Sequence, residues 1–223
     1  MKKEIYEKRG VNEVVHFTTN KGLLGTLACG FLLSRHRLPE NELLQYIIFN
    51  NAEVRPEHSD YFDKQENWID FVNLSLSEIN RRYFDVSKNK WHEGKDIFWV
   101  ILSFDPIIMT HENVYFATTN NAYLYCERKK GVEGFENLFA DEVKRKDGYY
   151  GIWKAKRLGR GSHLATCEQA EILYPAGVPV EHLKRIYVRT EEEYDIVGGW
   201  LAEFHDQCVE VCISPAKFEG IPN

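Results

Sequence analysis

The sequence has no long hydrophobic run. Its longest apolar stretch of strand length, DIFWVILSF at residues 96–104, falls well short of the roughly 20 residues that a membrane-spanning helix needs. The first ten residues, MKKEIYEKRG, are charged and are followed by short apolar runs, unlike a secretory signal peptide. We therefore expect a cytoplasmic protein without membrane contact.

Cysteine is scarce as well. The chain has five cysteines, an odd number at scattered positions, which favours reduced thiols over a disulfide framework. Cys208 and Cys212, with His205 nearby, form the most metal-like group. Structural zinc normally needs four ligands at closer spacing, and QCVEVCIS alternates like a strand with both thiols on one face. The sequence therefore predicts no metal site.

Repeats, low-complexity tracts and linkers rich in Pro, Gly or Ser are also missing, which favours a single domain over residues 1–223. A hydrophobic content of 43% is enough for a sizeable core. Apolar patterns predict helices at 18–30, 38–49 and 192–205, a helical segment at 120–130, and strands at 13–17, 68–76, 96–104, 114–118, 169–175, 182–189 and 207–213. Helices come early and strands concentrate later, which indicates an α+β fold.

Positive charge is in deficit over the whole chain but concentrated in one stretch. Residues 144–160 hold seven basic residues and one acid, a local balance of +6 in a chain of net charge −6. Tyr149, Tyr150 and Trp153 lie in the same stretch. Residues 141–166 show no clean period and predict a long loop, and such loops are usually functional. The stretch indicates a local anion site, or alternatively a solvated basic hairpin whose aromatic side chains fold into the core.

Two short segments hold candidate chemical groups. If residues 169–174 form a strand, Gln169, Glu171 and Leu173 share one face. A carboxylate among apolar neighbours must lie in a cleft or be paired, unless it faces solvent on an edge strand. His16 and Thr18 share a face of another predicted strand, where a lone histidine is commonly structural. Neither segment by itself identifies a function.

Four blocks of the chain, in this order and spacing, resemble the DarT family of DNA ADP-ribosyltransferase toxins. The blocks are HFTTNKGLLGTLACGFLLSR, WIDFVNLSLSEINRRYF, IFWVILSFDPIIMTHENVYFATTNNAYLY and QAEILYPAGVPVEHLKRIYV. The resemblance runs from about Val14 to Ile213. It implies a single ADP-ribosyltransferase-like α+β domain with central mixed or antiparallel sheets flanked by helices. It also implies a substrate-recognition loop at about residues 120–170.

The resemblance assigns roles to individual residues. Glu171 matches the catalytic glutamate of the family. The NAD-binding positions of the family fall on His16, Phe17, Thr18, Gly25 and Leu33. A catalytic arginine that also contacts NAD falls on Arg55. Arg81 and Arg82 are alternatives for the phosphate-binding role, because the arginine-rich pattern of the family is not reproduced around Arg55.

The implied chemistry fits a single carboxylate. Transfer of ADP-ribose from NAD breaks a C–N glycosidic bond through an oxocarbenium-like centre. Nicotinamide leaves from a pyridinium that is already charged, so no second carboxylic acid is needed to protonate it, unlike in ordinary glycoside hydrolysis. Glu171 would stabilise the developing charge and accept a proton from the attacking base. NAD is then the co-substrate, and the reaction needs no metal.

The resemblance also suggests how an acceptor would be held. Basic side chains would neutralise phosphates while aromatic side chains stack on unpaired bases, which favours single-stranded DNA. The residues expected to contact DNA are Lys154, Lys156, Arg157, Trp153, Tyr149, Tyr150 and Gln169. The Gln-x-Glu arrangement of 169–171 resembles ADP-ribosyltransferases that modify an amide or a guanine. The Asn-Asn-Ala of 120–122 and the Asn-Leu-Ser of 73–75 look closer to the guanine-modifying branch of the family than to the thymine-modifying one.

Other functions remain open at this stage. An RNA or protein acceptor is possible within the same enzyme class, because the loop sequence does not reveal the acceptor. A nucleic-acid-binding module without catalysis is the alternative from another class, and the retained His16, Thr18 and Glu171 argue against it. The resemblance further implies a partner antitoxin, of macrodomain or NADAR type, that removes ADP-ribose.

Overall fold

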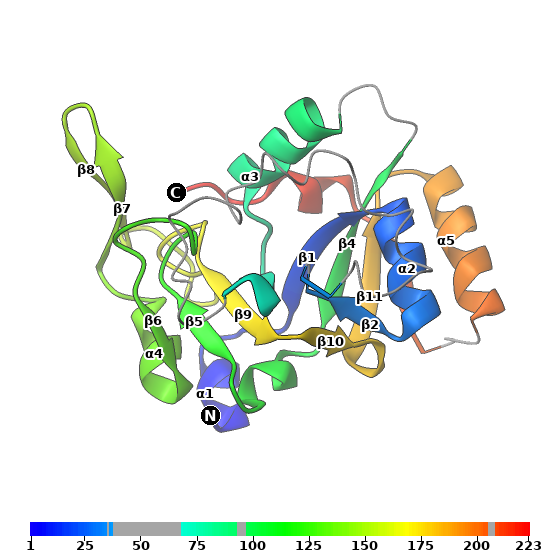
Figure 1. Ribbon diagram of the computed structural model, residues 1–223, viewed down its shortest axis with the longest axis horizontal. Helices are drawn as coiled ribbons and strands as arrows, with labels where there is room; N and C mark the ends of the chain where they lie inside the picture. The colour runs from blue at the N-terminus through cyan, green and yellow to red at the C-terminus, as the bar shows by residue number, and fades with distance from the viewer. Residues whose placement is uncertain (35, 38–67, 93–96, 205–207) are drawn as a thin grey trace.

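The structure is a computed structural model that describes residues 1–34, 36, 37, 68–92, 97–204 and 208–223. The helix expected at 38–49 and the candidate Arg55 lie outside these described residues. Figure 1 shows a large twisted sheet with helices packed around it and a thin hairpin that projects from the body.

The main sheet has eight strands in the order β12-β11-β4-β1-β3-β9-β5-β6. Its members are β1 (Val14–Thr19), β3 (Phe71–Leu76), β4 (Trp99–Phe104), β5 (Tyr115–Ala117), β6 (Arg128–Lys130), β9 (Glu171–Pro175), β11 (Leu183–Val188) and β12 (Glu210–Ile213). The β11–β12 pair is parallel, whereas the other neighbouring pairs run antiparallel. This mixed sheet confirms the expected α+β fold.

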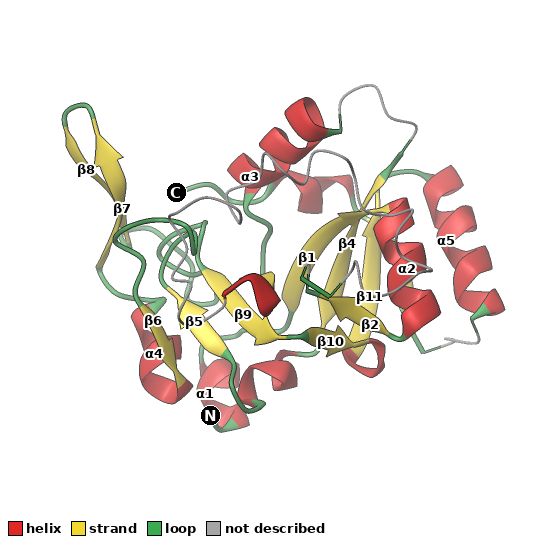
Figure 2. Ribbon diagram, in the orientation of Figure 1, coloured by secondary structure: helices red, strands yellow, loops and turns green. Residues whose placement is uncertain are grey.

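Helices cover the two faces of the sheet. They are α1 (Lys3–Lys8), α2 (Asn20–Cys29), α3 (Arg81–Val86), α4 (Gly131–Asn137) and α5 (Glu191–Glu203), as Figure 2 shows in red. One core cluster joins α2 and α5 to Val100 and Leu102 of β4, and a second joins α3 to Trp99 and Ile101. Because β4 is packed on both faces, every one of its residues is buried. Its apolar sequence follows from this position, and its polar residue, Ser103, donates to the carboxylate of Glu13 at 2.7 Å.

The sheet divides between β1 and β3. These strands pair at two positions, Val14 with Leu76 and Val15 with Ser75. Beyond that point β1 stays paired with β4 as far as Thr19, while β3 stays paired with β9 as far as Phe71. The two halves therefore separate like the arms of a fork, and the fork opens toward the end of β1 and the start of β3.

Two smaller sheets complete the fold. The short strands β2 (Phe31–Leu33) and β10 (Gly177–Pro179) pair antiparallel. β7 (Glu142–Gly148) and β8 (Gly151–Lys156) form the projecting hairpin seen in Figure 1. The expectation of a long loop at 141–166 was therefore wrong for its first half. The alternation that marks a strand is confined to the base of the hairpin, where Val143 and Ala155 pack against Cys167.

The helical segment expected at 120–130 was also wrong. Residues 120–127 form turns and β6 follows. The side-chain oxygen of Asn120 accepts from the backbone N–H of Ala122 at 2.9 Å, a local bond that competes with helix formation. The Arg128 guanidinium donates to the carbonyl oxygens of Asn121 and Cys126 and fixes these turns from the side.

Candidate functional site

The His16–Thr18 segment lies on β1 at the opening of the fork. Thr19 ends β1 and caps α2, because its hydroxyl accepts from the backbone N–H of Gly22 at 3.2 Å. A Cβ atom at position 22 would lie 2.1 Å from Oγ1 of Thr18. Glycine at 22 therefore leaves the room that the Thr18 side chain occupies, and it couples the start of α2 to the candidate site.

His16 bridges the two arms of the fork. Its Nδ1 lies 2.8 Å from the carbonyl oxygen of Asn73 on β3. Because a carbonyl oxygen can only accept, Nδ1 carries the proton and Nε2 of the neutral ring is an acceptor. Burial lowers the pKa of His16 from its ordinary value of 6.5, while the bond to Asn73 acts in the opposite direction. The ring is therefore neutral at pH 7, with Nε2 as a hydrogen-bond acceptor.

Phe17 connects β1 to α3. Its ring lies 5.2 Å from that of Phe84 and 5.8 Å from that of Trp99, both in edge-on contacts. It also lies 6.0 Å from the ring of Tyr83. Phe17 is half-buried in this aromatic cluster, so it contributes to the shape of the site as much as to any ligand contact.

Glu171 begins β9 near the branch point of the fork. It pairs with Ala117 of β5, and the next residue, Ile172, pairs with Leu74 of β3. Ser75, which follows Leu74, pairs with Val15 of β1, and His16 is the next residue along β1. The half-buried Glu171 carboxylate accepts from the backbone N–H of Asn121 at 2.7 Å.

The turn that holds Glu171 depends on Arg128. The guanidinium of Arg128 donates to the side-chain and backbone oxygens of the buried Asn121. It also lies 5.3 Å from the ring centre of Trp68. Arg128 therefore orients the N–H group that meets the Glu171 carboxylate. Sequence reasoning missed this residue, because no local pattern separates it from the neighbouring Lys129 and Lys130.

A cavity of about 220 Å³ lies beside this turn. It is lined by aromatic, cationic and amide side chains together with one valine. The lining residues are Arg82, Tyr83, Val86, Asn120, Tyr123, Arg145, Lys146, Trp153 and Gln169. Tyr83 touches Phe17, and Asn120 and Gln169 are near neighbours in sequence of Asn121 and Glu171. The cavity therefore connects the fork to the projecting hairpin.

The two arginines considered as alternatives for phosphate binding, Arg81 and Arg82, have different surroundings. Arg82 lines the cavity and pairs with Glu168 at 3.0 Å, with half of its side chain exposed. Arg81 instead binds Asp85 at 2.8 Å, and it also contacts Glu219 and the Phe218 carbonyl. Arg81 thus fixes α3 to the 215–219 turn, and Arg82 is the alternative with access to a ligand.

The remaining expected NAD contacts lie on the other side of β1. Gly25 is buried in α2, and Leu33 ends β2, where it pairs with Gly177. The chain after β2 is tied down by Asp70, which accepts from Ser34 at 2.8 Å and from two nitrogens of Arg37 at 2.8 Å each. These contacts place the segment after β2 beside the start of β3.

The basic stretch divides by residue type. Its four lysines, Lys144, Lys146, Lys154 and Lys156, are exposed along the hairpin. Its three arginines bind the protein instead: Arg145 pairs with Glu168, Arg157 donates to the Leu164 and Gly161 carbonyls, and Arg160 pairs with Glu78.

This division between exposed lysines and internally bonded arginines bears on Lys154, Lys156 and Arg157, all three of which were expected from the sequence to contact DNA. Lys154, which pairs with Glu142 at 2.7 Å, and Lys156 are both exposed to solvent. Arg157 holds the loop after the hairpin.

Aromatic side chains crowd the hairpin. Tyr149 and Tyr150 at its tip are 91% and 97% exposed, and Trp153 is 49% exposed. The alternative in which these aromatics fold into the core is therefore wrong. Lys146 lies 5.2 Å from the ring centre of Trp153 and 5.5 Å from that of Tyr123, at the mouth of the cavity. Cationic and aromatic groups thus alternate from the cavity to the hairpin tip.

Three further findings bear on the sequence expectations. The five cysteines are free thiols, and burial raises the pKa of Cys126 to about 12. Within the described ranges, no group of three or more His, Cys, Asp or Glu side chains is placed to hold a metal ion, and His205 lies outside them. No helix among the described residues is long and apolar enough to span a bilayer.

Known proteins give one consistent comparison. The solved structures include Thermosipho africanus DarTG in complex with ADP-ribose, at 16% identity and a TM-score of 0.61, covering 93% of this chain and 51% of that one. Thermus sp. 2.9 DarT in complex with ADP-ribosylated ssDNA is 14% identical, with a TM-score of 0.62, and the match covers 93% of this chain and 96% of that one. The complex of the same protein with NAD+ is 14% identical, with a TM-score of 0.60, and the match covers 92% of this chain and 96% of that one. The chain thus spans about half of the Thermosipho chain and nearly all of the Thermus chain.

At these identities the likeness is one of fold. A comparison with curated protein sequences finds no match. Residues 15–219, however, match the family model described as "ssDNA thymidine ADP-ribosyltransferase, DarT". That match covers β1 with His16, the hairpin and β9 with Glu171, and it identifies the chain as a member of the DarT family of single-stranded-DNA ADP-ribosyltransferases.

Proposed function

We propose that this protein transfers ADP-ribose from NAD to a base of single-stranded DNA and releases nicotinamide. The observation that carries the proposal is the cavity between the Glu171 turn and the hairpin. Its aromatic walls suit a flat base, and its cationic groups suit the flanking phosphates. An unpaired base can enter such a cavity without the cost of leaving a duplex.

The residues of the fork supply the NAD side of the reaction. Neutral His16 presents Nε2 as an acceptor, and Thr18 adds a hydroxyl on the same strand. Arg82 offers a half-exposed guanidinium for phosphate, and Arg55 keeps the role given by the resemblance. Gly25 and Leu33 complete the proposed NAD contacts.

Glu171 performs the chemical role. Its carboxylate is oriented by the Asn121 N–H and stands at the branch point of the two arms. Negative charge at this point stabilises the positive charge that develops at the ribose carbon in the transition state. The same carboxylate then accepts the proton of the attacking base. Gln169, two residues earlier and in the cavity wall, orients the acceptor base by its side-chain amide.

We further propose guanine as the acceptor base. The Asn120–Asn121 pair of the guanine-like pattern lies in the turn beside Glu171, with Asn120 in the cavity wall. Asn and Gln amides can each donate and accept, which suits the acceptor and donor edges of guanine.

The test uses defined oligonucleotides with NAD and purified protein. Mass spectrometry of single-stranded DNA with one guanine and no thymine should show an ADP-ribose adduct. Oligonucleotides with one thymine and no guanine, RNA of the same sequence and added protein should show none. Modification of thymine alone would overturn the choice of base, and modification of RNA or protein alone would overturn the DNA assignment.

A role as a toxin with a neutralising partner follows from the proposed activity. Unrestrained modification of DNA would stop replication, so a cell carrying this protein needs an enzyme that removes ADP-ribose. Expression of the wild-type chain should arrest growth, and expression of the Glu171→Gln variant should not. Growth arrest that persists in the variant would contradict the toxin role.

A further inference from the structure

The loop that leads from the hairpin to Glu171 is held by side chains rather than by regular structure. Residues 157–170 form turns and bends between β8 and β9. Arg157 donates to the carbonyls of Gly161 and Leu164, and Arg160 donates to that of Ala165. Thr166 binds Leu138 and Ala140 at 2.8 and 2.6 Å. The loop therefore depends on a few discrete bonds for its position.

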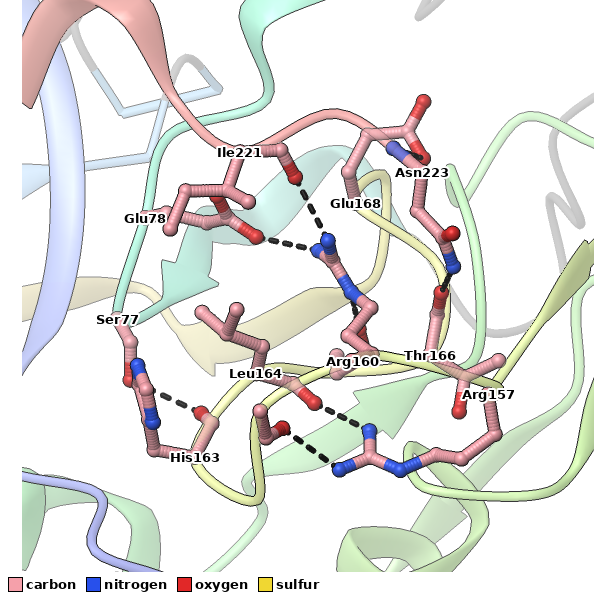
Figure 3. A network of polar contacts seen from close by, with 12 residues as sticks. Ser77, Glu78, Arg157, Arg160, His163, Leu164, Thr166, Glu168, Ile221 and Asn223 are labelled. Carbon is pink, nitrogen blue, oxygen red and sulfur yellow. Dashed lines mark hydrogen bonds and ion pairs between the residues drawn. The ribbon is translucent and has the colours of Figure 1, made fainter.

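The segment 220–223 completes this set of bonds, as Figure 3 shows. It begins at Gly220, whose φ of 57° lies in the left-handed region, and a Cβ there would lie 3.0 Å from the Ile79 carbonyl. Arg160 then donates to the Ile221 carbonyl at 2.7 Å. The same guanidinium pairs with the buried Glu78, which fixes the direction of the segment.

Asn223 bonds to four residues of the hairpin and of the loop at 157–170. Its side-chain nitrogen donates to the carbonyl of Lys156 at the end of β8, at 2.9 Å, and to that of Thr166 in the loop. Its backbone N–H lies 3.3 Å from the Glu168 carboxylate, and its backbone oxygen accepts from Arg145 on β7. Asn223 thus connects the base of the hairpin to the loop. Its contact in the loop, Glu168, lies three residues before Glu171.

Arg145 and Glu168 connect Asn223 to the wall of the cavity. Glu168 is 3% exposed and pairs with Arg145 at 2.5 Å and with Arg82 at 3.0 Å. Both arginines line the cavity. A shift of Asn223 would therefore move the groups that shape the cavity, whereas His16 and the NAD arm lie elsewhere in the fold.

We propose that Asn223 is a positioning residue that latches the DNA-binding hairpin to the loop carrying Gln169 and Glu171. The proposal rests on the proposed function for its effect on DNA, but the latch itself is a property of the fold. Its side-chain amide is the part that spans the hairpin and the loop, because it alone bonds to both Lys156 and Thr166.

The test compares Asn223→Ala with Ile221→Ala. Ile221 is the matched control, since it contacts Arg160 through its backbone carbonyl while its side chain is 51% exposed. Asn223→Ala removes two hydrogen bonds, so we expect the KM for single-stranded DNA to rise about fivefold to tenfold with kcat for NAD hydrolysis without DNA unchanged. Ile221→Ala should match the wild type in both.

Hydrogen exchange separates the latch from the proposed function. Backbone amides of residues 142–156 and 161–170 should exchange faster in Asn223→Ala than in the wild type, and no faster in Ile221→Ala. Unchanged exchange and an unchanged KM would overturn the latch. If the wild-type protein modifies no DNA, the proposed function fails, and the exchange rates alone then decide for or against the latch.

Discussion

At the scale of single residues, the Glu171 carboxylate accepts a hydrogen bond from the backbone N–H group of Asn121. A glutamine at 171 keeps an oxygen for this bond but loses the negative charge. Because the charge acts on the transition state, Glu171→Gln should lower kcat for DNA modification by about a hundredfold to a thousandfold while leaving the affinity for NAD nearly unchanged. Turnover with a defined oligonucleotide and calorimetry with NAD measure the two quantities.

The control for this change is Glu112→Gln, at an exposed glutamate. It should have wild-type turnover. Glu168 is not suitable as a control, because it is buried between Arg145 and Arg82 and its loss would leave two cations without their partner. Wild-type turnover in Glu171→Gln would contradict the catalytic assignment.

His16 gives a prediction that includes pH. His16→Ala should raise the Kd for NAD about tenfold, because a ligand group would lose its acceptor. Burial holds the pKa of His16 below 6.5, so the ring stays neutral as pH rises from there. The wild-type affinity for NAD should therefore be flat between about pH 6.5 and 8. Titration calorimetry at several pH values tests this, with His163→Ala as an exposed control; an affinity that falls steadily toward pH 6.5 would show a charged His16.

At the scale of elements, we propose that the hairpin is the part that meets DNA. Lys144 and Lys154 lie opposite each other across β7 and β8. Each contact with a phosphate of a single strand contributes about 0.7 to the slope of log K against log salt. Replacing both lysines by alanine should therefore reduce the slope by about 1.4. Fluorescence anisotropy of labelled single-stranded DNA across a salt series gives the slope.

The hairpin tip supplies the matched comparison. Replacing the exposed Tyr149 and Tyr150 by alanine should weaken DNA binding with the slope unchanged, because stacking releases no counterions. An unchanged slope in the lysine variant would mean that DNA binds elsewhere.

Elements also show how far the sequence predicts the structure. The strands β1, β3, β4, β9 and β11 follow their apolar patterns, and the helix expected at 18–30 is α2, with Thr19 and Gly30 at its two ends. The hairpin and the turns at 120–127 do not, because bonds from residues distant in sequence hold them. Asn121 meets Glu171, and Thr166 meets Leu138 and Asn223. Such contacts leave no local period.

The candidate site, like the fold, was predicted from the sequence only in part. His16 and Glu171 were identified as candidates through the resemblance, and the fold places their strands, β1 and β9, on the two sides of β3. The structural roles of Arg145, Arg157 and Arg160 were hidden, since a run of basic residues looks alike whether its members face water or bind carbonyls and carboxylates. Burial separates them, and burial depends on the whole fold.

At the scale of the whole molecule, Glu78 links stability to pH. Burial outweighs the attraction of Arg160 and raises the pKa of Glu78 from 4.5 to about 7. Between these values the folded state binds more protons than the unfolded state, so the free energy of unfolding falls as pH rises from about 4.5 to about 7. Urea unfolding over this range should show the fall, and Glu78→Gln should reduce it.

His16 affects this measurement with the opposite sign. Its lowered pKa makes the folded state bind fewer protons, so its contribution is lost as pH falls below 6.5. Comparing the wild type with Glu78→Gln cancels this term, because His16 is present in both. Equal pH dependence in the two proteins would contradict the raised pKa of Glu78.

The division of the basic stretch into exposed lysines and internal arginines has a chemical consequence. Amines react with acylating reagents, whereas guanidinium groups do not react under the same mild conditions. Treatment with acetic anhydride would therefore neutralise Lys144, Lys146, Lys154 and Lys156, together with the other accessible lysines, and leave Arg145, Arg157 and Arg160 in their bonds. The acylated protein should keep its fold and its NAD chemistry but lose its attraction to DNA. The positive charge proposed to attract an acceptor could in this way be removed, while the positive charge that holds the fold together remains.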